Sequence, residues 1–411
     1  MNSPLLQNID LFLDDKPSVF ALREKAKEAL LKQGFPNTKT EAWKYTDVKE
    51  LVQKNFLIDT TEHTCENDCC HHHHTDSVIE IHFCNGKLHV EEYNTPKGLS
   101  ITPLPLALYE GEYKKYILNS FDLEKHPFAA LNGTYLEQGI CIEASTSIDT
   151  PVLLKYKFDD CENQQLNLHN IIILNKSAKL NIVEDFTSTK KSSHFTNIVN
   201  EIYLKELSVL NHYKKQQENS LAYHIAFNAI KIYKEANYKQ VYYANGSKLS
   251  RQETLINLEQ PLANAEVYSA YKAKKDSLTD ITTNINHLVA ETTSNQYAKA
   301  VLEEDATATF QGKIHIAPNA IKTSGYQLHK ALYLDDTASL NCKPELEIYA
   351  DDVKCSHGAS CGELDKDQLF YLTSRGIDKD TAIDILTKAH LEEIFSYITE
   401  EKIKDLFFIN K

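Results

Sequence analysis

The region from about residue 141 to residue 349 consists of short runs rich in β-branched and aromatic residues, with no long stretch of helical periodicity. Runs such as 171–174, 198–204 and 266–271 are typical of strands, whereas 221–233 is ambiguous between helix and strand. So long a region of short strands leaves three architectures open, namely a β-sandwich, a propeller and a β-helix.

Small residues recur at corners ahead of apolar residues within this region, as in Ser177-Ala-Lys-Leu180 and Thr337-Ala-Ser-Leu340. Their separations are unequal, so the repeat signal is weak. It nevertheless suits stacked coils, because one coil cannot bury its apolar face alone and needs its neighbours.

The N-terminal part mixes helix and hairpin signals. Ser18 is a candidate cap for a helix that extends to about Leu31, with Gly34 as its stop. Farther along, alternating apolar residues flank Asn85-Gly86, which is a strong signal for a two-residue hairpin turn.

The C-terminal part is predicted to be helical. Asp365 can cap a short helix that Gly376 ends, and Asp378 opens a longer amphipathic segment. Apolar residues from Leu391 to Ile398 stand at helical spacing. From these residues alone, packing on the chain's own core is favoured over docking of another protein, and both readings stay open.

Composition excludes several classes of function. The formal net charge is −14, with only three arginines, which argues against nucleic acid or anionic lipid as the main partner. No apolar run approaches the roughly 20 residues of a membrane span. The N-terminus does not resemble a signal peptide, and the nine cysteines fit no disulfide framework, so we expect a cytoplasmic protein with reduced thiols. No phosphate-binding glycine loop and no nucleophile motif is present, which predicts a protein that is not an enzyme.

An insert at 61–75 is unusually rich in metal-binding side chains, with three cysteines and four consecutive histidines, His71–His74. A segment with so many thiols and imidazoles binds zinc, nickel or copper incidentally. Adjacent ligands strain a single tetrahedral centre, so an exposed flexible loop is favoured over a dedicated metal or iron-donor role.

Cys355 and His357 stand two residues apart at the end of an alternating run. In an extended chain they project from one face, which makes a two-ligand corner suited to iron, copper or zinc. Two ligands do not close a metal site. The pair is therefore either half of a site completed elsewhere, or a packed cysteine beside a histidine bonded to the backbone.

Five blocks of sequence, 41–46, 310–314, 322–327, 343–359 and 367–377, closely resemble the SufB/SufD superfamily. Its members are non-ATPase scaffold subunits of the SUF machine for iron–sulfur cluster assembly. The segment Asp351-Asp-Val-Lys-Cys-Ser-His357 favours the SufD branch.

The resemblance implies a mainly β fold, a right-handed parallel β-helix flanked by N-terminal α/β and C-terminal α-helical parts. The implied domains are 1–135, 136–360 and 361–411. The implied partners are SufB, met through the end of the β-helix, and the SufC ATPase, met through the C-terminal helical part. A homodimer of the isolated chain stays open, as does the involvement of a flavin. The expected SufC docking region comprises Asp365, Leu369, Phe370, Arg375, Gly376, Leu391, Ile394 and Phe395.

The resemblance also implies a site at the interface with SufB, where an iron–sulfur cluster is assembled transiently and no cofactor is held tightly by the isolated chain. His357 is the first candidate for a ligand or essential polar group, and Cys355 the second. Cys361 is a third candidate ligand, although a small residue filling a valine-sized place is favoured for it. The competing functions are a β-helix enzyme, such as a polysaccharide lyase or an acyltransferase, and a Cys/His metal-buffering protein.

Overall fold

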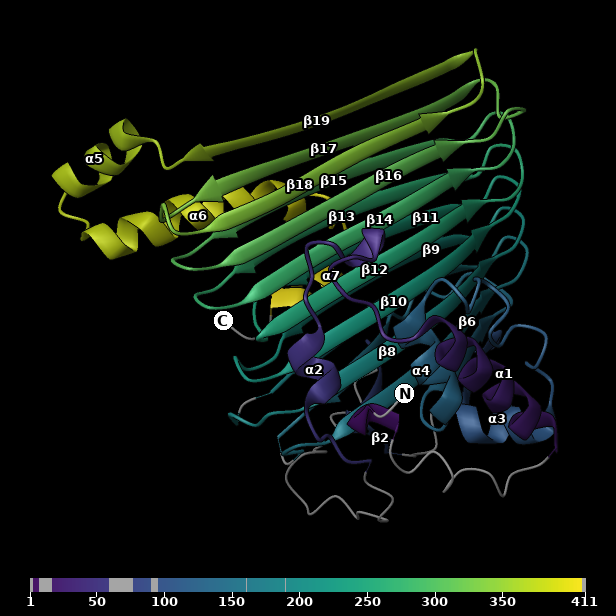
Figure 1. The fold of residues 1–411 in the computed structure, drawn as a ribbon. Helices are drawn as coiled ribbons and strands as arrows, with labels where there is room; N and C mark the ends of the chain where they lie inside the picture. The colour runs from purple at the N-terminus through teal and green to yellow at the C-terminus, as the bar shows by residue number, and fades with distance from the viewer. Residues whose placement is uncertain are drawn as a thin grey trace.

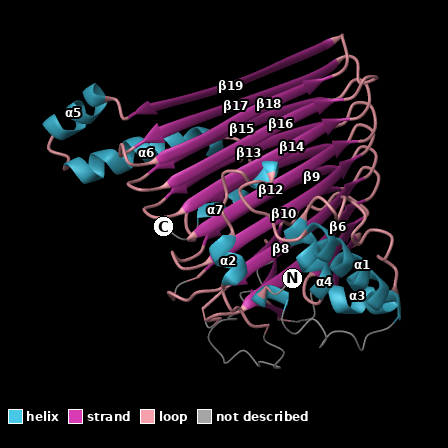
Figure 2. Ribbon diagram, in the orientation of Figure 1, coloured by secondary structure: helices cyan, strands magenta, loops and turns pink. Residues whose placement is uncertain are grey.

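The structure is a computed structural model that describes residues 3–6, 17–58, 77–89, 95–159, 161–188 and 190–408. The insert predicted at 61–75 lies outside the described residues. The centre of the molecule is a parallel β-solenoid of about seven turns, with helices at both ends of the chain (Figures 1 and 2). The predicted β-helix fold is confirmed.

Successive strands alternate between two sheets, and within each sheet a strand pairs in parallel with the strand two positions along the chain. The exceptions lie at the N-terminal end of the stack, where β1–β2 and β3–β4 are antiparallel pairs within one sheet and β1 pairs in parallel with β5. The ten-stranded sheet contains β1 (Ile79–Cys84), β2 (Lys87–Leu88), β5 (Val152–Lys157), β7 (Lys179–Thr187), β9 (Val209–Gln217), β11 (Asn237–Ala244), β13 (Asn264–Ala273), β15 (Thr293–Leu302), β17 (Thr323–Tyr333) and β19 (Val353–Glu363). The nine-stranded sheet contains β3 (Leu99–Pro103), β4 (Ile140–Ala144), β6 (Gln165–Leu174), β8 (Phe195–Leu204), β10 (Tyr223–Ile232), β12 (Leu249–Leu258), β14 (Leu278–His287), β16 (Thr307–Ile316) and β18 (Ser339–Ile348).

Small-residue corners mark turns between the sheets. Ser177 has a φ of 61° and is followed by Ala178, which is 0% exposed; Asp305, with a φ of 54°, precedes the buried Ala306 in the same way. A left-handed residue reverses the chain there, and only a small side chain fits at the inner corner. The ambiguous run 221–233 is strand β10, because pairing with β8 and β12 outweighs its local helical pattern.

Helices cover the outer faces of both sheets. The N-terminal helices pack on the nine-stranded sheet, and α6 and α7 pack on the ten-stranded sheet. Strands beneath these helices are therefore buried on both faces. On β6, for example, Ile172 belongs to the interior core and Ile173 to the core beneath the N-terminal helices. Parallel strands buried on both faces read as continuous apolar runs. The described helices are η1 (Pro4–Leu6), α1 (Pro17–Gln33), η3 (Glu41–Trp43), α2 (Lys49–Gln53), α3 (Leu104–Glu110), α4 (Pro127–Tyr135), α5 (Lys366–Ser374), α6 (Lys379–Phe395) and α7 (Glu401–Phe408).

Two local predictions in the N-terminal part have different outcomes. The hairpin turn is confirmed, with Asn85 at φ 48° and Gly86 at φ 77° between β1 and β2. The cap at Ser18 is wrong, because α1 already begins at Pro17. Proline suits the first position of a helix, where its missing N–H would have no partner in any case.

The predicted domain limits cut across the observed elements. β1 lies within 1–135, yet it extends the ten-stranded sheet by pairing in parallel with β5. At the other end, β19 continues to Glu363, past the predicted limit at residue 360. None of the helices in the described part of the chain is long and apolar enough to span a bilayer.

Candidate functional site

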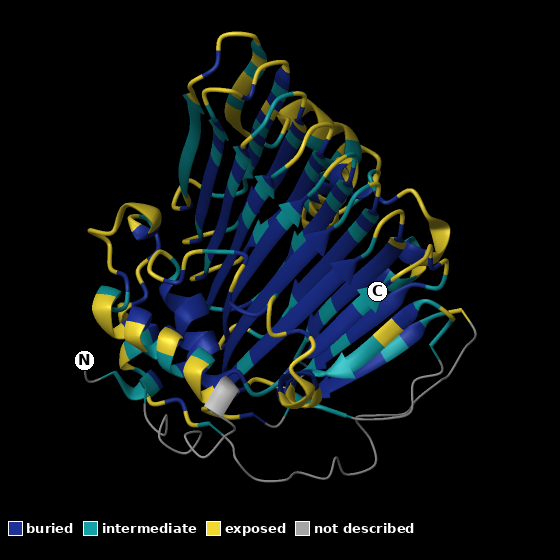
Figure 3. Ribbon diagram, turned by 90° about the vertical axis from the view of Figure 1, so that its right-hand side faces the viewer, coloured by how far each residue is buried: buried dark blue, intermediate teal, exposed yellow. Residues whose placement is uncertain are grey.

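Strands β18 and β19 form the last coil of the β-helix, and each has a neighbour within its sheet on one side only. None of their residues is fully buried, in contrast to the strands in the middle of the stack (Figure 3). A free strand edge presents unpaired backbone groups and is a template for another chain. The β-helix therefore has an open end, which we define as β18 and β19.

The three predicted site residues lie on β19 at positions of one parity. Cys355 is aligned with Gly325 of β17, and His357 with Gln327. The Gln327 amide donates to the carbonyl of Gly312 on β16, across the interior, so this parity faces the space between the sheets. Aligned residues of parallel strands share a face, and Cys355, His357 and Cys361 therefore face the interior at its open end.

The three residues differ in exposure. Cys355 is partly buried and packs against the small cluster around Ile314 and Ile316. Burial raises the pKa of its thiol, which keeps the sulfur protonated in the isolated chain. His357 and Cys361 are exposed. The His357 imidazole and the Cys361 thiol are thus the groups that a partner can reach directly.

Sequence reasoning missed Cys342 at the open end and His329 on the neighbouring strand β17. Cys342 on β18 has its Sγ 3.7 Å from Nδ1 of His329, whose Nε2 shares a hydrogen bond of 2.7 Å with the Tyr271 hydroxyl. Burial, and then the nearby Cys361, raise the pKa of Cys342 to about 11. The alternation of β18 could have placed Cys342 on the inner face, but His329 belongs to another coil and gives no local signal.

These side chains do not form a complete metal site by themselves. Within the described ranges, no three histidine, cysteine, aspartate or glutamate side chains are grouped so as to hold a metal ion. The open end therefore offers separate soft donors on an edge strand, which is chemistry suited to a site shared with a second chain.

The short helix α5 carries exposed apolar side chains. Asp365 caps its N-terminus, with its carboxylate accepting from the N–H groups of Asp367 and Gln368, as predicted. Phe370 is 72% exposed and Tyr371 is 58% exposed, and no residue of the helix is buried. An aromatic pair of this kind on a projecting helix is typical of a contact surface (Figure 1).

The longer helix α6 has the opposite character. Asp378 caps it by accepting from the N–H of Thr381 at 2.9 Å, as predicted. Leu391, Ile394 and Phe395 are buried against the ten-stranded sheet. These three expected docking residues are covered by the chain itself, because the sheet's outer apolar face needs a cover.

The N-terminal block 41–46 is fastened to the outer face of the nine-stranded sheet. Trp43 is buried, and the guanidinium carbon of Arg251 lies 4.0 Å from its ring centroid. Arg251 pairs with Asp280, which also accepts from the Thr46 hydroxyl. Lys343 of β18 pairs with Glu41, so the block also contacts the open end.

Comparison with known proteins assigns the chain to a family. Residues 157–390 match the SufBD core domain of the SUF system for FeS cluster assembly, and residues 7–154 match the SufBD protein N-terminal region.

Three relatives match this chain over most of their own length. A SufBD family iron–sulfur cluster assembly protein of Synechocystis is 28% identical over 92% of this chain and 86% of its own length. Escherichia coli SufD is 27% identical, covering 92% of this chain and 88% of its own length. The chloroplastic protein ABCI7 of Arabidopsis thaliana is 26% identical, covering 93% and 83%. With the β-helix, the flanking helices and both family regions present, the chain belongs to the SufB/SufD family of iron–sulfur cluster assembly proteins and is SufD-like.

Proposed function

We propose that this chain is the non-ATPase, non-enzymatic scaffold subunit of a cytoplasmic complex that assembles iron–sulfur clusters. In this proposal it pairs with SufB through the open end and holds the SufC ATPase through α5. Membership of the SufB/SufD family supports the assembly role. The observation that supports pairing with SufB is the last coil of the β-helix. There, two free strand edges flank inward-facing thiols and an exposed imidazole.

The cluster is the cargo of this site. His357 is the first ligand or essential polar group that we assign to it, with Cys355 and Cys361 as further soft donors. The remaining ligands come from SufB, so the site is complete only in the complex. A movement of the two subunits relative to each other would then open it, and nucleotide-driven movement of SufC would supply that shift.

Docking of SufC is proposed for α5 and its ends, from Asp365 to Gly376. Phe370 and Tyr371 supply exposed apolar area, and Arg375 lies over the Tyr371 ring at 5.3 Å, which stiffens the surface. The buried Leu391, Ile394 and Phe395 then hold α6 on the β-helix and so set the position of α5.

Co-purification tests both contacts. The tagged chain is co-expressed with SufB and SufC, and the recovery of each partner is measured together with cluster assembly. Phe370→Ser is expected to reduce SufC recovery at least tenfold and to leave SufB recovery unchanged. Leu31→Ser, which alters an exposed leucine on α1, is the matched control.

The cluster site needs a separate pair of variants. His357→Ala is expected to abolish cluster assembly in the intact complex, whereas Ser356→Ala on the opposite face of β19 leaves it unchanged. Unchanged assembly and SufB binding in His357→Ala would show that the site assignment is wrong. Failure to recover SufB and SufC with the unaltered chain would refute the scaffold proposal itself.

A further inference from the structure

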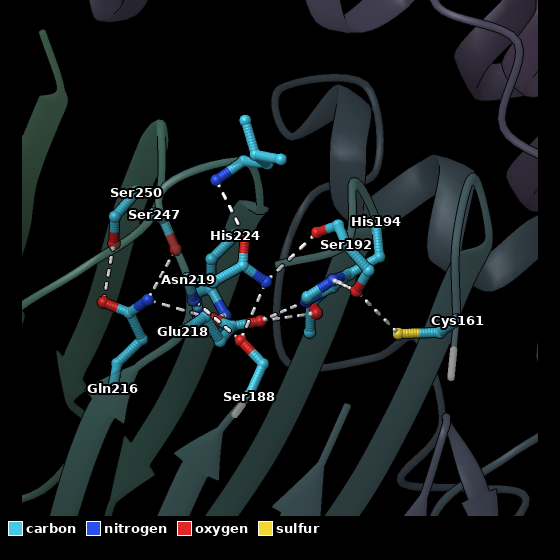
Figure 4. A network of polar contacts seen from close by, with 12 residues as sticks. Cys161, Ser188, Ser192, His194, Gln216, Glu218, Asn219, His224, Ser247 and Ser250 are labelled. Atoms are coloured by element: carbon cyan, nitrogen blue, oxygen red, sulfur yellow. Dashed lines mark hydrogen bonds and ion pairs between the residues drawn. The ribbon is translucent and has the colours of Figure 1, made fainter. Parts of the chain in front are cut away.

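A chain of buried polar side chains lies inside the β-helix, away from the open end. It connects Cys161, in the loop before β6, with Ser192 and His194 before β8, and with Glu218 after β9 (Figure 4). Cys161 and His194 are 0% exposed, and Glu218 is 3% exposed. These residues come from successive coils and stack along the axis of the β-helix.

The contacts form a continuous relay. The Sγ of Cys161 is 3.9 Å from the Ser192 Oγ, which is 3.5 Å from Nδ1 of His194. Nε2 of His194 is 3.1 Å from Oε1 of Glu218. On its other oxygen, Glu218 meets Nδ1 of His224 at 2.7 Å. A thiol, an imidazole and an orienting carboxylate in this order are the parts of an activated cysteine nucleophile.

Electrostatics keep the central imidazole charged. Burial disfavours the protonated ring, but hydrogen bonds and charge from Cys161 and Glu218 outweigh burial and raise the pKa of His194 to about 10. Burial also opposes the charge of Glu218, yet His224 and His194 hold the pKa of that carboxyl well below its usual range. An imidazolium next to a cysteine, held in turn by a carboxylate, is the arrangement in which cysteine nucleophiles are activated.

We propose that Cys161 is a modification site, at which a thiol activated by His194 and Glu218 reacts with small neutral peroxides. The reagent must be small because the sulfur is fully buried. It must be neutral because a charged reagent would lose its hydration on entering the interior.

The reaction balances with hydrogen peroxide as oxidant. The Cys161 thiolate attacks one peroxide oxygen, and the O–O bond breaks with its electron pair on the other oxygen. That oxygen takes the imidazolium proton of His194 and leaves as water. Sulfur is oxidised by two electrons to sulfenic acid, and His194 is left neutral, still held by Glu218.

Cys141 provides an internal control. It is also 0% exposed, but the charges that act on its thiol are those of carboxylates. Burial, and then the charges of Glu143 and Glu201, raise the pKa of Cys141 to about 12. The two thiols are equally buried but have different charged neighbours, so a comparison of their rates separates activation by His194 from access of the reagent.

The experiment exposes the intact native chain to hydrogen peroxide, traps sulfenic acid with dimedone, and measures the adduct at each cysteine by mass spectrometry. We expect Cys161 to be labelled at least tenfold faster than Cys141. His194→Gln should lower the rate at Cys161 at least tenfold and leave Cys141 unchanged, with the melting temperature confirming that the variant is folded. If that variant does not fold, the proposal is tested by the ratio of the labelling rates of Cys161 and Cys141 in the unaltered chain.

Equal rates at Cys161 and Cys141 would mean that both react only when the chain opens, and would overturn the proposal. Adducts confined to the exposed Cys361 would overturn it as well.

Discussion

Arg251 joins the N-terminal block to the β-helix, and its removal should destabilise the molecule strongly. The side chain is 0% exposed, lies over Trp43, pairs with Asp280 and reaches the Glu253 carboxylate at 3.2 Å. Burial opposes its charge, yet Asp280 and Glu253 raise the pKa of Arg251 above its ordinary value. In Arg251→Met the fully buried Asp280 keeps only hydroxyl donors, from Thr46 and Thr282.

The size of the destabilisation by Arg251→Met follows from two lost interactions. Leaving a buried charge without its partner costs about 3–5 kcal/mol, and the lost stacking on Trp43 adds about 1 kcal/mol. The unfolding entropy of a chain of 411 residues is roughly 0.9 kcal/mol per degree. The melting temperature of Arg251→Met should therefore fall by about 5 °C, measured by scanning calorimetry.

Two further variants test the reasoning. Arg375→Met removes an exposed arginine on the surface after α5 and should change the melting temperature by less than about 1 °C. Adding Asp280→Asn to Arg251→Met removes the buried carboxylate charge that has lost its partner. The double variant should therefore regain about half of the lost melting temperature. An Arg251→Met melting temperature within 1 °C of the unaltered chain would refute the reasoning.

Three other predictions concern stability. Burial lowers the pKa of His287 to about 4 and that of His329 to about 3. The unfolded chain therefore binds more protons below about pH 6.5, and each histidine should lower the free energy of unfolding by about 1.4 kcal/mol per pH unit as pH falls toward 4. Urea unfolding at several pH values checks this, and His329→Gln should reduce the slope by one proton. Gly139→Ala would place a Cβ 1.9 Å from a backbone oxygen at φ 140°, and should cost roughly 3 kcal/mol. Gly362→Ala, with nothing within 4 Å, should cost less than about 0.5 kcal/mol by the same assay. Asp378→Ala should cost about 1 kcal/mol, with faster amide exchange in the first turn of α6.

Local chemistry determined the parts of this fold that sequence reasoning found. The Asn85-Gly86 turn and the caps at Asp365 and Asp378 were predictable because each depends on residues within one turn. Cys355 and His357 were predictable as a pair on one face, because strand alternation needs no distant partner. The identity of the family likewise came from contiguous blocks such as 343–359.

Tertiary structure alone decided the rest. The strands in the middle of the stack pair with strands about thirty residues away, as β10 does with β8 and β12, and that pairing turned an ambiguous run into a strand. Both faces of the sheets are covered, so apolar patterning could not tell the interior from the outer face, nor show that the sheet buries Ile394. The relay from Cys161 through His194 to Glu218 exists only because successive coils stack these residues in register. No local pattern records such contacts, since the energy that selects them is burial between neighbouring coils.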